Sequence, residues 1–201
     1  MTVHLELPAI YQFPPLFTRQ PNKSIRNKQI ETWINIILTN CEQCKIWTIT
    51  KQGDMKIIDP DTQQVTTFNI FHNTEIDRSC SPIFINEIWQ MMQKQGQLLN
   101  RDGKDLKIST DSDELQTDEE FYILWKSLEL WANEILDWFE RTTQLNKVVT
   151  FYEIVSSEDN FNESFYSMPE PLLYQILKIL VKRGRATMLK ENSKYVAIKV
   201  I

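Results

Sequence analysis

The 201-residue chain has few of the residues on which many enzyme active sites depend. Its four glycines, at positions 53, 96, 103 and 184, are too scattered to form a glycine-rich loop that holds phosphate. It has two histidines and neither a G-x-S-x-G nor an H-E-x-x-H signature. No pair of carboxylates stands in the apolar setting that would shift a pKa for acid–base chemistry. We therefore expect a protein without enzymatic activity and without a cofactor.

The chain also lacks long hydrophobic runs and is poor in cysteine. No stretch reaches the roughly 18 apolar residues of a membrane-spanning helix. The N-terminus lacks the basic and apolar regions of a signal peptide. The three cysteines are an odd number and too few for a disulfide scaffold. These features predict a protein of the reducing cytoplasm.

Positive charge is in deficit. Lys and Arg number 22 against 27 Asp and Glu, a net charge of −5, whereas phosphate binding needs a positive field. Residues 1–126 hold 13 basic and 17 acidic side chains, and residues 127–201 hold 9 and 10, so neither half is basic. We therefore expect no nucleic-acid partner.

A DNA-binding regulator is the alternative to this interpretation. It rests on the basic end of a predicted helix over 169–184, which carries Lys178, Lys182 and Arg183 and is followed by Arg185 and Lys190. The same side chains can also be explained without DNA, because basic residues in water at the C-terminal end of a helix interact favourably with the helix dipole. The acidic balance favours a surface for protein contact.

One group of residues resembles a zinc site. Cys41 and Cys44 form a C-x-x-C pair that His72 and Cys80 would complete. A second C-x-x-C is missing, and the other two ligands lie 28 and 36 residues beyond Cys44. Redox chemistry is disfavoured because the pair follows a predicted helix C-terminus, where the dipole does not stabilise a thiolate. We interpret the cysteines as incidental thiols and expect no metal site.

Hydrophobic spacing divides the chain into two halves with the same order of elements. In the first half it predicts helices over 25–40 and 82–95 and strands over 45–50 and 121–125. Polar sequence continues to about Asn69, and the charged stretch 101–120 is expected to be a wing or loop. In the second half it predicts helices over 128–142 and 169–184, a strand over 147–154, and a hairpin of 186–189 and 194–200.

The two halves also align in register. The helix over 82–95 aligns with that over 169–184 at an offset of 88, which places Gly96 on Gly184, and residues 45–48 align with 147–150 at an offset of 102. Two helix–strand–helix–helix–strand–strand units follow, and this is the order of a winged helix. The predicted fold is α+β: two tandem winged-helix domains, 23–126 and 127–201, preceded by an extended proline- and aromatic-rich segment, 1–22.

Residues 7–21, LPAIYQFPPLFTRQP, form the most unusual segment, because it is too rich in proline for a regular helix and too apolar for a free tail. Proline restricts φ, so such a segment loses little entropy when it binds. An aromatic side chain near a proline can enter an apolar pocket while the backbone follows a groove. Two interpretations stay open: an arm that wraps over the chain's own first domain, and a docking peptide for another protein.

Four segments together resemble a known family: YQFPPLFTRQPN (11–22), FYILWKSLELWANEILDWFE (121–140), VVTFYEI (148–154) and RATMLKENSKYVAIKV (185–200). They resemble the small subunit of the ESCRT-II complex in its fungal form. The resemblance implies tandem winged helices without enzymatic activity. It also implies a heterotetramer in which two copies of this chain join one copy each of two larger subunits, and which contacts the endosomal membrane only through those larger subunits.

The resemblance further implies that N-terminal motifs of the type PPxY or PPxF enter hydrophobic pockets on the larger subunits. Pro14, Pro15 and Phe17 match the second motif. Pro8 and Tyr11 match the first, in which Ala9 replaces a proline. The expected docking residues are Pro8, Tyr11, Phe13, Pro14, Pro15, Leu16 and Phe17.

The second winged helix of the family recruits an ESCRT-III subunit by binding its first helix, which implies a function in sorting ubiquitinated cargo into multivesicular bodies. We expect the contact on outward side chains of a strand over 149–153, namely Thr150, Tyr152 and Glu153. The wing lysines Lys190 and Lys194 are expected to face an acidic partner.

Overall fold

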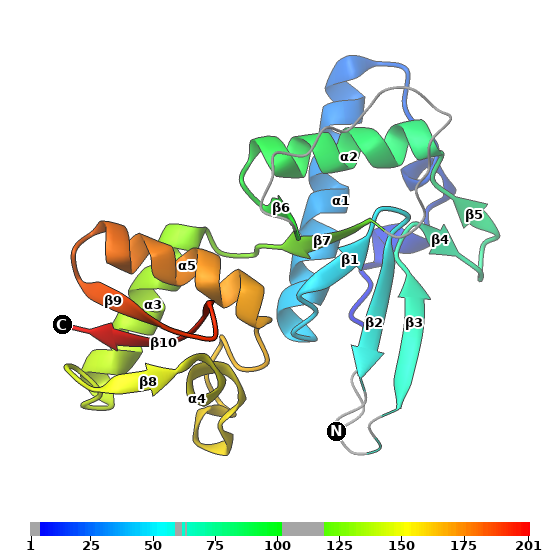
Figure 1. Ribbon diagram of the computed structural model, residues 1–201. Coiled ribbons are helices and arrows are strands. Elements are labelled where there is room, and N and C mark those ends of the chain that lie inside the picture. The colour runs from blue at the N-terminus through cyan, green and yellow to red at the C-terminus, as the bar shows by residue number, and fades with distance from the viewer. Residues whose placement is uncertain (1–4, 59–61, 63, 102–118) are drawn as a thin grey trace. The chain divides into compact units, whose positions relative to one another are not determined.

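The computed structural model describes residues 5–58, 62, 64–101 and 119–201 (Figure 1). The chain forms two compact units, Met1–Trp125 (unit 1) and Lys126–Ile201 (unit 2). The sequence placed the domain boundary between residues 126 and 127, and most of its predicted wing, 102–118, lies outside the described residues. Both units combine helices with an antiparallel sheet, so the predicted α+β class is confirmed.

Unit 1 is built around a long helix, α1 (Lys23–Gln43), and a second helix, α2 (Pro82–Lys94). Its main sheet has the antiparallel strand order β3-β2-β1-β7-β6, and β4 and β5 form a separate pair. The strands are β1 (Thr48–Thr50), β2 (Asp54–Ile58), β3 (Val65–Asn69), β4 (His72–Asn73), β5 (Arg78–Ser79), β6 (Leu98–Asn100) and β7 (Glu120–Ile123).

Local signals explain where the helices of unit 1 begin and end. The Asn22 side chain caps α1 by accepting hydrogen bonds from two N–H groups of the first turn, at 2.9 and 3.2 Å. Ser81 caps α2, and Pro82 occupies its first position, where a missing N–H breaks no hydrogen bond. Gly96 follows α2 with a left-handed φ of +71°. Both predicted helices of this half are confirmed, and α1 is longer than expected.

Unit 2 has the order helix–strand–helix–helix–strand–strand of a winged helix. Its sheet is antiparallel with the order β8-β10-β9, and the β9–β10 hairpin is the wing (Figure 1). The elements are α3 (Leu128–Arg141), β8 (Val148–Thr150), α4 (Phe151–Ser156), the 3₁₀ turn η3 (Glu158–Asn160), α5 (Glu170–Lys182), β9 (Ala186–Glu191) and β10 (Lys194–Val200).

The two units correspond in register. Helices α2 and α5 each span 13 residues and lie 88 residues apart, as the sequence predicted. Gly96 and Gly184 follow them with the same φ of +71°. In the first strands, β1 and β8, the offset is 100 and not the predicted 102. Ile49 of β1 pairs with Phe121 of β7, and Val149 of β8 pairs with Ile198 of β10 in the same way. The reason is local: the turn after α1 places Lys45 at a left-handed φ of +50°, and β1 begins only at Thr48.

The units differ between their first strand and their last helix. Unit 2 has α4 there, whereas the described residues of unit 1 hold no helix between β1 and α2 but the β2–β3 hairpin and the β4–β5 pair. The sequence had shown only a polar stretch at β2 and β3. The prediction missed them because β3 has no buried residue, so the alternation that reveals a half-buried strand is absent.

Candidate docking surfaces

The N-terminal arm, defined here as residues 7–21, packs against the rest of unit 1. It forms two 3₁₀ turns, η1 (Ala9–Gln12) and η2 (Pro14–Leu16), in place of the extended peptide that the sequence predicted. Three of its side chains, Tyr11, Leu16 and Phe17, are 2 %, 4 % and 2 % exposed. The interpretation of residues 7–21 as an arm over the chain's own first domain therefore holds for these three residues.

Buried polar groups fix the arm in place. Gln29 of α1 donates from Nε2 to the carbonyl oxygens of Pro15, Leu16 and Thr18 at 3.1, 2.8 and 2.9 Å. Trp33 donates from Nε1 to the Leu16 carbonyl at 3.1 Å. An arm without a regular ladder of its own obtains its hydrogen bonds from α1, which satisfies carbonyls that burial would otherwise leave unpaired.

The arm also contacts the strands of unit 1 through Tyr11. Its hydroxyl donates to the Ile70 carbonyl at 2.9 Å, and its own carbonyl accepts from Asn73 Nδ2 at 2.9 Å. Burial raises the pKa of this tyrosine above its ordinary value, because the phenolate would lose its hydration. Tyr11 therefore stays protonated and serves as a donor.

Aromatic contacts continue from the arm into the core. The ring of Phe17 meets that of Trp33 edge to face at 5.2 Å, and Tyr11 lies 5.3 Å from Phe17. Beyond Trp33 the contacts run through Phe71 to Trp89, each step also 5.2 Å. The arm thus supplies the outermost rings of a continuous aromatic core.

Three of the seven predicted docking residues are buried in unit 1. Tyr11, Leu16 and Phe17 face the chain's own core, where Trp33 and Gln29 hold them, and the docking role of the segment stays a prediction. The other four residues, Pro8, Phe13, Pro14 and Pro15, are exposed, and the exposed fraction of Phe13 is 56 %. The sequence pattern could not separate the two sets, because 3₁₀ turns do not alternate their faces with the period of a strand.

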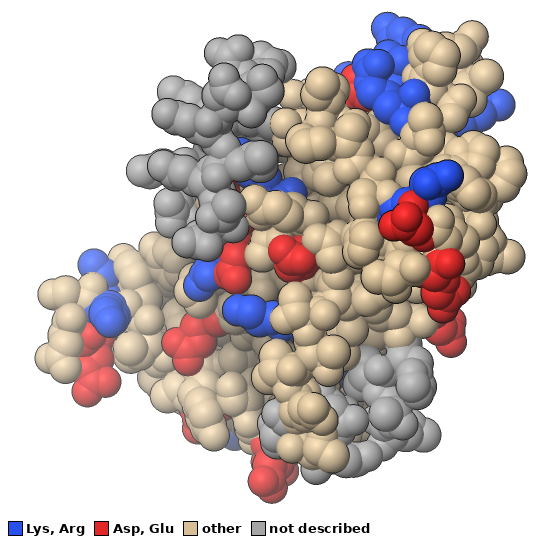
Figure 2. Space-filling view, turned by 90° about the vertical axis from the view of Figure 1, so that its right-hand side faces the viewer, with Lys and Arg blue, Asp and Glu red and all other residues tan. Residues whose placement is uncertain are grey.

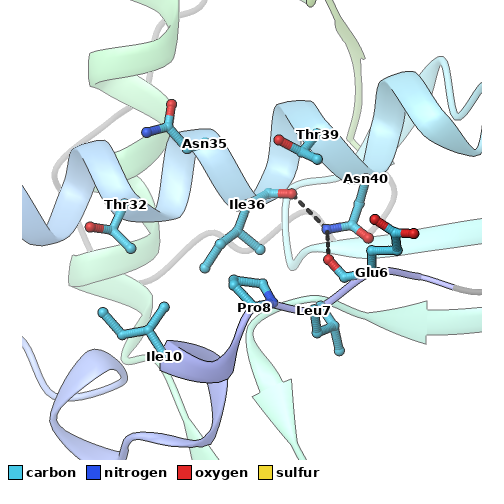
Figure 3. Close-up of a pocket in the computed structure, with 9 residues that line it drawn as sticks. All are labelled: Glu6, Leu7, Pro8, Ile10, Thr32, Asn35, Ile36, Thr39 and Asn40. Atoms are coloured by element: carbon cyan, nitrogen blue, oxygen red, sulfur yellow. Dashed lines mark hydrogen bonds between the residues drawn. The ribbon is translucent and has the colours of Figure 1, made fainter.

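A cavity of about 520 Å³ lies between the start of the arm and α1 (Figure 3). Pro8 and Ile10 border it from the arm, and Ile36 and Asn40 border it from the helix. The buried Asn40 amide donates to the Ile36 carbonyl at 2.8 Å and to the Glu6 carbonyl at 3.4 Å, which ties the arm to the helix. A partner segment seated here would meet the arm and α1 together.

In unit 2 the predicted contact strand ends at Thr150 and a helix follows. Thr150 and Glu153 form a capping box: Glu153 N–H donates to Thr150 Oγ1 at 3.1 Å, and Thr150 N–H donates to Glu153 Oε2 at 2.6 Å. Hydrogen bonds from the Thr150 N–H and the Thr150 hydroxyl lower the pKa of the Glu153 carboxyl. The prediction of a strand through Glu153 is wrong, because the T-x-x-E signal outweighs the β-branched residues before it.

The five residues predicted to contact ESCRT-III do not share one surface cavity. Tyr152 is 63 % exposed, whereas Thr150 and Glu153 are engaged with each other. Glu153 borders a cavity together with Lys147 and Asp159. Lys194 borders another, beside the stacked rings of Tyr174 and Tyr195, and Lys190 Nζ lies 4.5 Å from the Tyr195 ring centroid.

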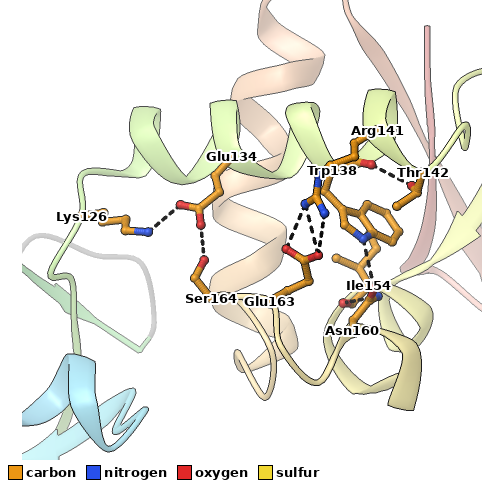
Figure 4. Close-up of polar contacts among 9 residues, drawn as sticks. All are labelled: Lys126, Glu134, Trp138, Arg141, Thr142, Ile154, Asn160, Glu163 and Ser164. Atoms are coloured by element: carbon orange, nitrogen blue, oxygen red, sulfur yellow. Dashed lines mark hydrogen bonds and ion pairs between the residues drawn. The ribbon is translucent and has the colours of Figure 1, made fainter.

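Polar contacts hold the segment that follows α4 against α3 (Figure 4). Arg141 forms an ion pair with Glu163 at 3.1 Å, and Ser164 donates to Glu134, which also binds Lys126 at 2.7 Å. The sequence interpretation assigned no structure to this region. Its polar residues gave no periodic signal, and its partners lie on another helix.

The cysteines do not form a C-x-x-C site in the structure. Cys41 and Cys80 are buried, and burial raises the pKa of both thiols. A hydrogen bond of 2.7 Å joins His72 Nδ1 and Ser79 Oγ. Within the described ranges, no three or more His, Cys, Asp and Glu side chains are grouped so that they could hold a metal ion. No helix in those ranges combines the length and the apolar character needed to span a membrane.

Unit 2 has the element order of a winged helix, whereas unit 1 lacks the predicted middle helix among its described residues and combines two helices with an antiparallel sheet. Together with the exposed apolar side of the arm, this build is typical of an interaction protein. The comparison with protein families agrees with this class. The model of the ESCRT-II complex subunit family matches residues 10–169, and the chain belongs to that family.

Its relatives cover nearly the whole chain. Vacuolar protein-sorting-associated protein 25 of Saccharomyces cerevisiae is 45 % identical over 97 % of this chain and 98 % of its own length. The Homo sapiens protein of that name is 28 % identical, with 94 % of each chain covered. These similarities show an ESCRT-II subunit rather than an enzyme, and they give no support to the DNA-binding alternative.

Solved structures agree. The crystal structure of subunit VPS25 of the endosomal trafficking complex ESCRT-II matches with a TM-score of 0.79 and 43 % identity, over 98 % of this chain and 100 % of that one. A chain in the crystal structure of endosomal complex ESCRT-II (VPS22/VPS25/VPS36) matches with a TM-score of 0.77 and 42 % identity, over 98 % of each.

Proposed function

We propose that the chain is an adaptor that docks on the two larger subunits of ESCRT-II through its arm and recruits an ESCRT-III subunit through unit 2. The crystal structure of ESCRT-II that this chain matches is a complex of VPS22, VPS25 and VPS36. We take counterparts of VPS22 and VPS36 to be the two larger subunits. In this proposal two copies of the chain join one copy of each. The chain reaches the endosomal membrane from the cytoplasm only as part of the complex, where it acts in multivesicular-body cargo sorting.

The observation that carries the docking proposal is the exposed side of a fixed arm. Phe13 is 56 % exposed, although its N–H donates to Ile10 at 3.0 Å and its carbonyl accepts from Leu16 at 2.9 Å. Its backbone is thus held before any partner arrives, so binding loses less entropy. Burying a Phe side chain contributes about 1.5–3 kcal/mol, which is enough for a binding hot spot.

The arm therefore divides its predicted residues between two roles. Pro8, Phe13, Pro14 and Pro15 offer the surface for the larger subunits. The buried members of the motif, Tyr11, Leu16 and Phe17, anchor that surface to unit 1. Substituting an anchor disturbs folding, so a clean test of docking uses an exposed residue.

The test is co-purification of Phe13→Ala with the larger subunits. The substituted chain should fold as the parent does, because the ring is largely in water, and should lose most of its binding. Phe161→Ala is the matched control, since Phe161 is 61 % exposed and lies in unit 2. Equal recovery of the larger subunits with Phe13→Ala and with the parent chain would refute the docking role.

The ESCRT-III contact in unit 2 is proposed to involve Tyr152, Lys190 and Lys194, with Thr150 and Glu153 forming the cap of the helix that carries Tyr152. Tyr152 supports this because it is 63 % exposed, yet sits in the first turn of a capped helix. Tyr152→Ala should weaken binding of the first helix of the ESCRT-III subunit about tenfold or more. Undiminished binding by both Tyr152→Ala and a double Lys190→Glu, Lys194→Glu variant would refute this surface.

A further inference from the structure

Unit 1 carries a groove between its two helices whose lining contains no residue of the arm. The groove holds about 250 Å³. Four residues border it from α1 at positions i, i+3, i+4 and i+7, and four border it from α2 in the same pattern: Lys23, Arg26, Asn27 and Ile30, then Glu87, Gln90, Met91 and Lys94. Such a spacing is one face of each helix. Two helix faces that meet along a groove leave room for the ridge of a third helix.

The groove is basic, although the chain as a whole carries a net charge of −5. Its single carboxylate, Glu87, is already paired with Arg19 at 2.8 Å and with Arg26 at 3.5 Å. Lys23 and Lys94 are exposed, and no ion pair or hydrogen bond joins the side chain of either to a described residue. Figure 2 shows Lys and Arg side chains gathered at the top of unit 1, over the first turns of α1.

The chemical character of the lining changes across the groove. Ile30 is buried and Met91 is half-buried, so both give it an apolar base. The lysines stand at its rim. Apolar residues in the centre with charges around them are typical of surfaces that take up an amphipathic helix. Methionine adds a side chain that adapts to the shape of its partner.

Unit 2 lacks the helix turns that form one wall of this groove, because its first helix is shorter than α1. The Ile46 N–H donates to the Cys41 carbonyl at the end of α1, and the Gln144 N–H donates to the Phe139 carbonyl at the end of α3. These equivalent hydrogen bonds align the ends of the two helices. In this alignment α3 begins where Ile30 stands in α1. The first two turns of α1, which supply Lys23 and Arg26, therefore have no counterpart in unit 2.

We propose that this groove, the α1–α2 groove, binds an acidic amphipathic helix of a partner protein. The apolar stripe of that helix would cover Ile30 and Met91, and its Glu or Asp residues would pair with Lys23 and Lys94. Charge complementarity selects an acidic helix, because the groove offers two exposed lysines and its one carboxylate is already paired. A free phosphate would make no favourable contact with the apolar base of the groove, and a flat lipid surface would not fit into a concave groove between two helices.

None of the eight lining residues belongs to the arm. The arm reaches the groove through Arg19, which pairs with Glu87, and neither the groove test nor the Phe13 test substitutes these two residues. A loss of binding in the groove would leave Phe13 untouched. A failure of the arm to dock would leave the groove unaffected. The two proposals can therefore be refuted separately.

The test uses two synthetic peptides of about 20 residues, long enough for a helix, with identical composition of Leu, Ala and Glu. In the first, Leu recurs at i, i+3, i+4 and i+7 with Glu at the flanks. In the second, the order is scrambled so that no apolar stripe forms. Binding to the full-length chain is measured by fluorescence anisotropy. Vesicles of phosphatidylcholine with phosphatidylserine are the third probe.

The decisive variant is Lys23→Glu with Lys94→Glu. It should weaken binding of the striped peptide by at least about tenfold. It should leave the Tm nearly unchanged, because a carboxylate in the first turn of α1 is favourable to the helix dipole and one in the last turn of α2 is unfavourable by a similar amount. The matched control is Lys178→Glu with Lys182→Glu in α5, where Lys182 lies 88 residues after Lys94. The control carries the same charge change and should bind the peptide as the parent does.

Preferential binding of the striped peptide, lost in the groove variant and kept in the control, supports the proposal. Equal binding of the two peptides would overturn it, since charge alone would then suffice. So would undiminished binding by the groove variant, or equal loss in the control. Attachment to anionic vesicles that depends on Lys23 and Lys94, with no peptide binding, would also overturn it and assign the groove to a lipid surface.

Discussion

The two units complete their cores in different ways. In unit 1 the covering segment comes before the first helix: the arm brings Phe17 to Trp33 at 5.2 Å. In unit 2 the covering segment comes after α4, and brings Phe165 to Trp138 at 5.9 Å. In each unit an irregular segment without a ladder of its own places a buried Phe against a Trp of the first helix.

Each covering segment is secured by a buried side-chain amide. Gln29 of unit 1 donates to three arm carbonyls. Asn160 of unit 2 donates to the carbonyls of Glu153 and Ile154 at 2.8 and 3.1 Å, and accepts from Trp138 Nε1 at 3.0 Å. The comparison shows that residues 7–21 are part of a fold as well as part of a surface. Their prolines and aromatic residues must satisfy both demands.

The largest expected effect comes from removing the covering ring in either unit. Phe17→Ala and Phe165→Ala should each lower the free energy of unfolding of their own unit by about 3–5 kcal/mol, since a buried Phe leaves a cavity. Hydrogen exchange of amides in α1 and in α3 of the full chain measures the two units separately. Phe13→Ala is the control and should change stability by less than about 0.5 kcal/mol. An undisturbed unit 1 in Phe17→Ala would mean that the arm is not core.

A smaller effect is expected from the two amides. Gln29→Ala and Asn160→Ala should each cost about 1–3 kcal/mol, because buried carbonyls lose their donor. Hydrogen exchange should show the loss in the arm for the first and in α4 for the second. If Gln29→Ala left the hydrogen-exchange protection of the arm unchanged, water would be replacing the Gln29 side-chain amide as the donor to the arm carbonyls. The parallel between Gln29 in unit 1 and Asn160 in unit 2 would then fail.

The sequence predicted the helices well because their signals are local. Ser81 with Pro82, and the paired Gly96 and Gly184, mark helix ends by chemistry that acts within a few residues. The β2–β3 hairpin was missed because β3 has no buried side chain to produce an alternating pattern. Helix α4 was missed because its capping box was read as part of a strand.

The candidate surface was predictable only in outline. The proline and aromatic residues of 7–21 identified the segment, and the alternative of an ordered arm was considered. Which side chains face inward depends on Gln29, Trp33 and Asn73, which lie 8 to 52 positions beyond residue 21. No pattern within the segment contains that information. The α1–α2 groove was not foreseen at all, because its two walls lie about 60 residues apart in the sequence.

The glycines after α2 and α5 test whether the two units are energetically equivalent at a position where their backbone geometry is the same. Gly96 and Gly184 share a φ of +71°, and a Cβ added to either would meet nothing within 4 Å. Gly96→Ala and Gly184→Ala should therefore each cost about 1 kcal/mol, from the left-handed backbone alone. The readout is hydrogen exchange in α2 and in α5. Unequal costs would show that the two turns differ in rigidity despite equal dihedral angles.

The smallest effect separates the units by their response to acid. The first turns of α1 and α2 contain no acidic residue, whereas the first turn of α4 contains Glu153. The hydrogen bonds that Glu153 accepts from Thr150 lower the pKa of its carboxyl in the folded chain. The folded state thus binds this proton less readily than the unfolded state. The stabilisation is complete above the unfolded pKa, about 4.3, and is lost as the pH falls through the lower folded value.

Glu153→Gln should accordingly cost about 0.5 kcal/mol at neutral pH, a small value because water screens an exposed carboxylate. The cost should vanish on acidification, since protonated Glu153 has also lost its charge. Protection of the α4 amides, compared between the variant and the parent from pH 7 to about pH 3, measures this difference. Amides of α1 in the same samples are the control, because no carboxylate stands in its first turn. A gap between variant and parent that persists at the lowest pH would show that Glu153 acts through the shape of the capping box and not through its charge.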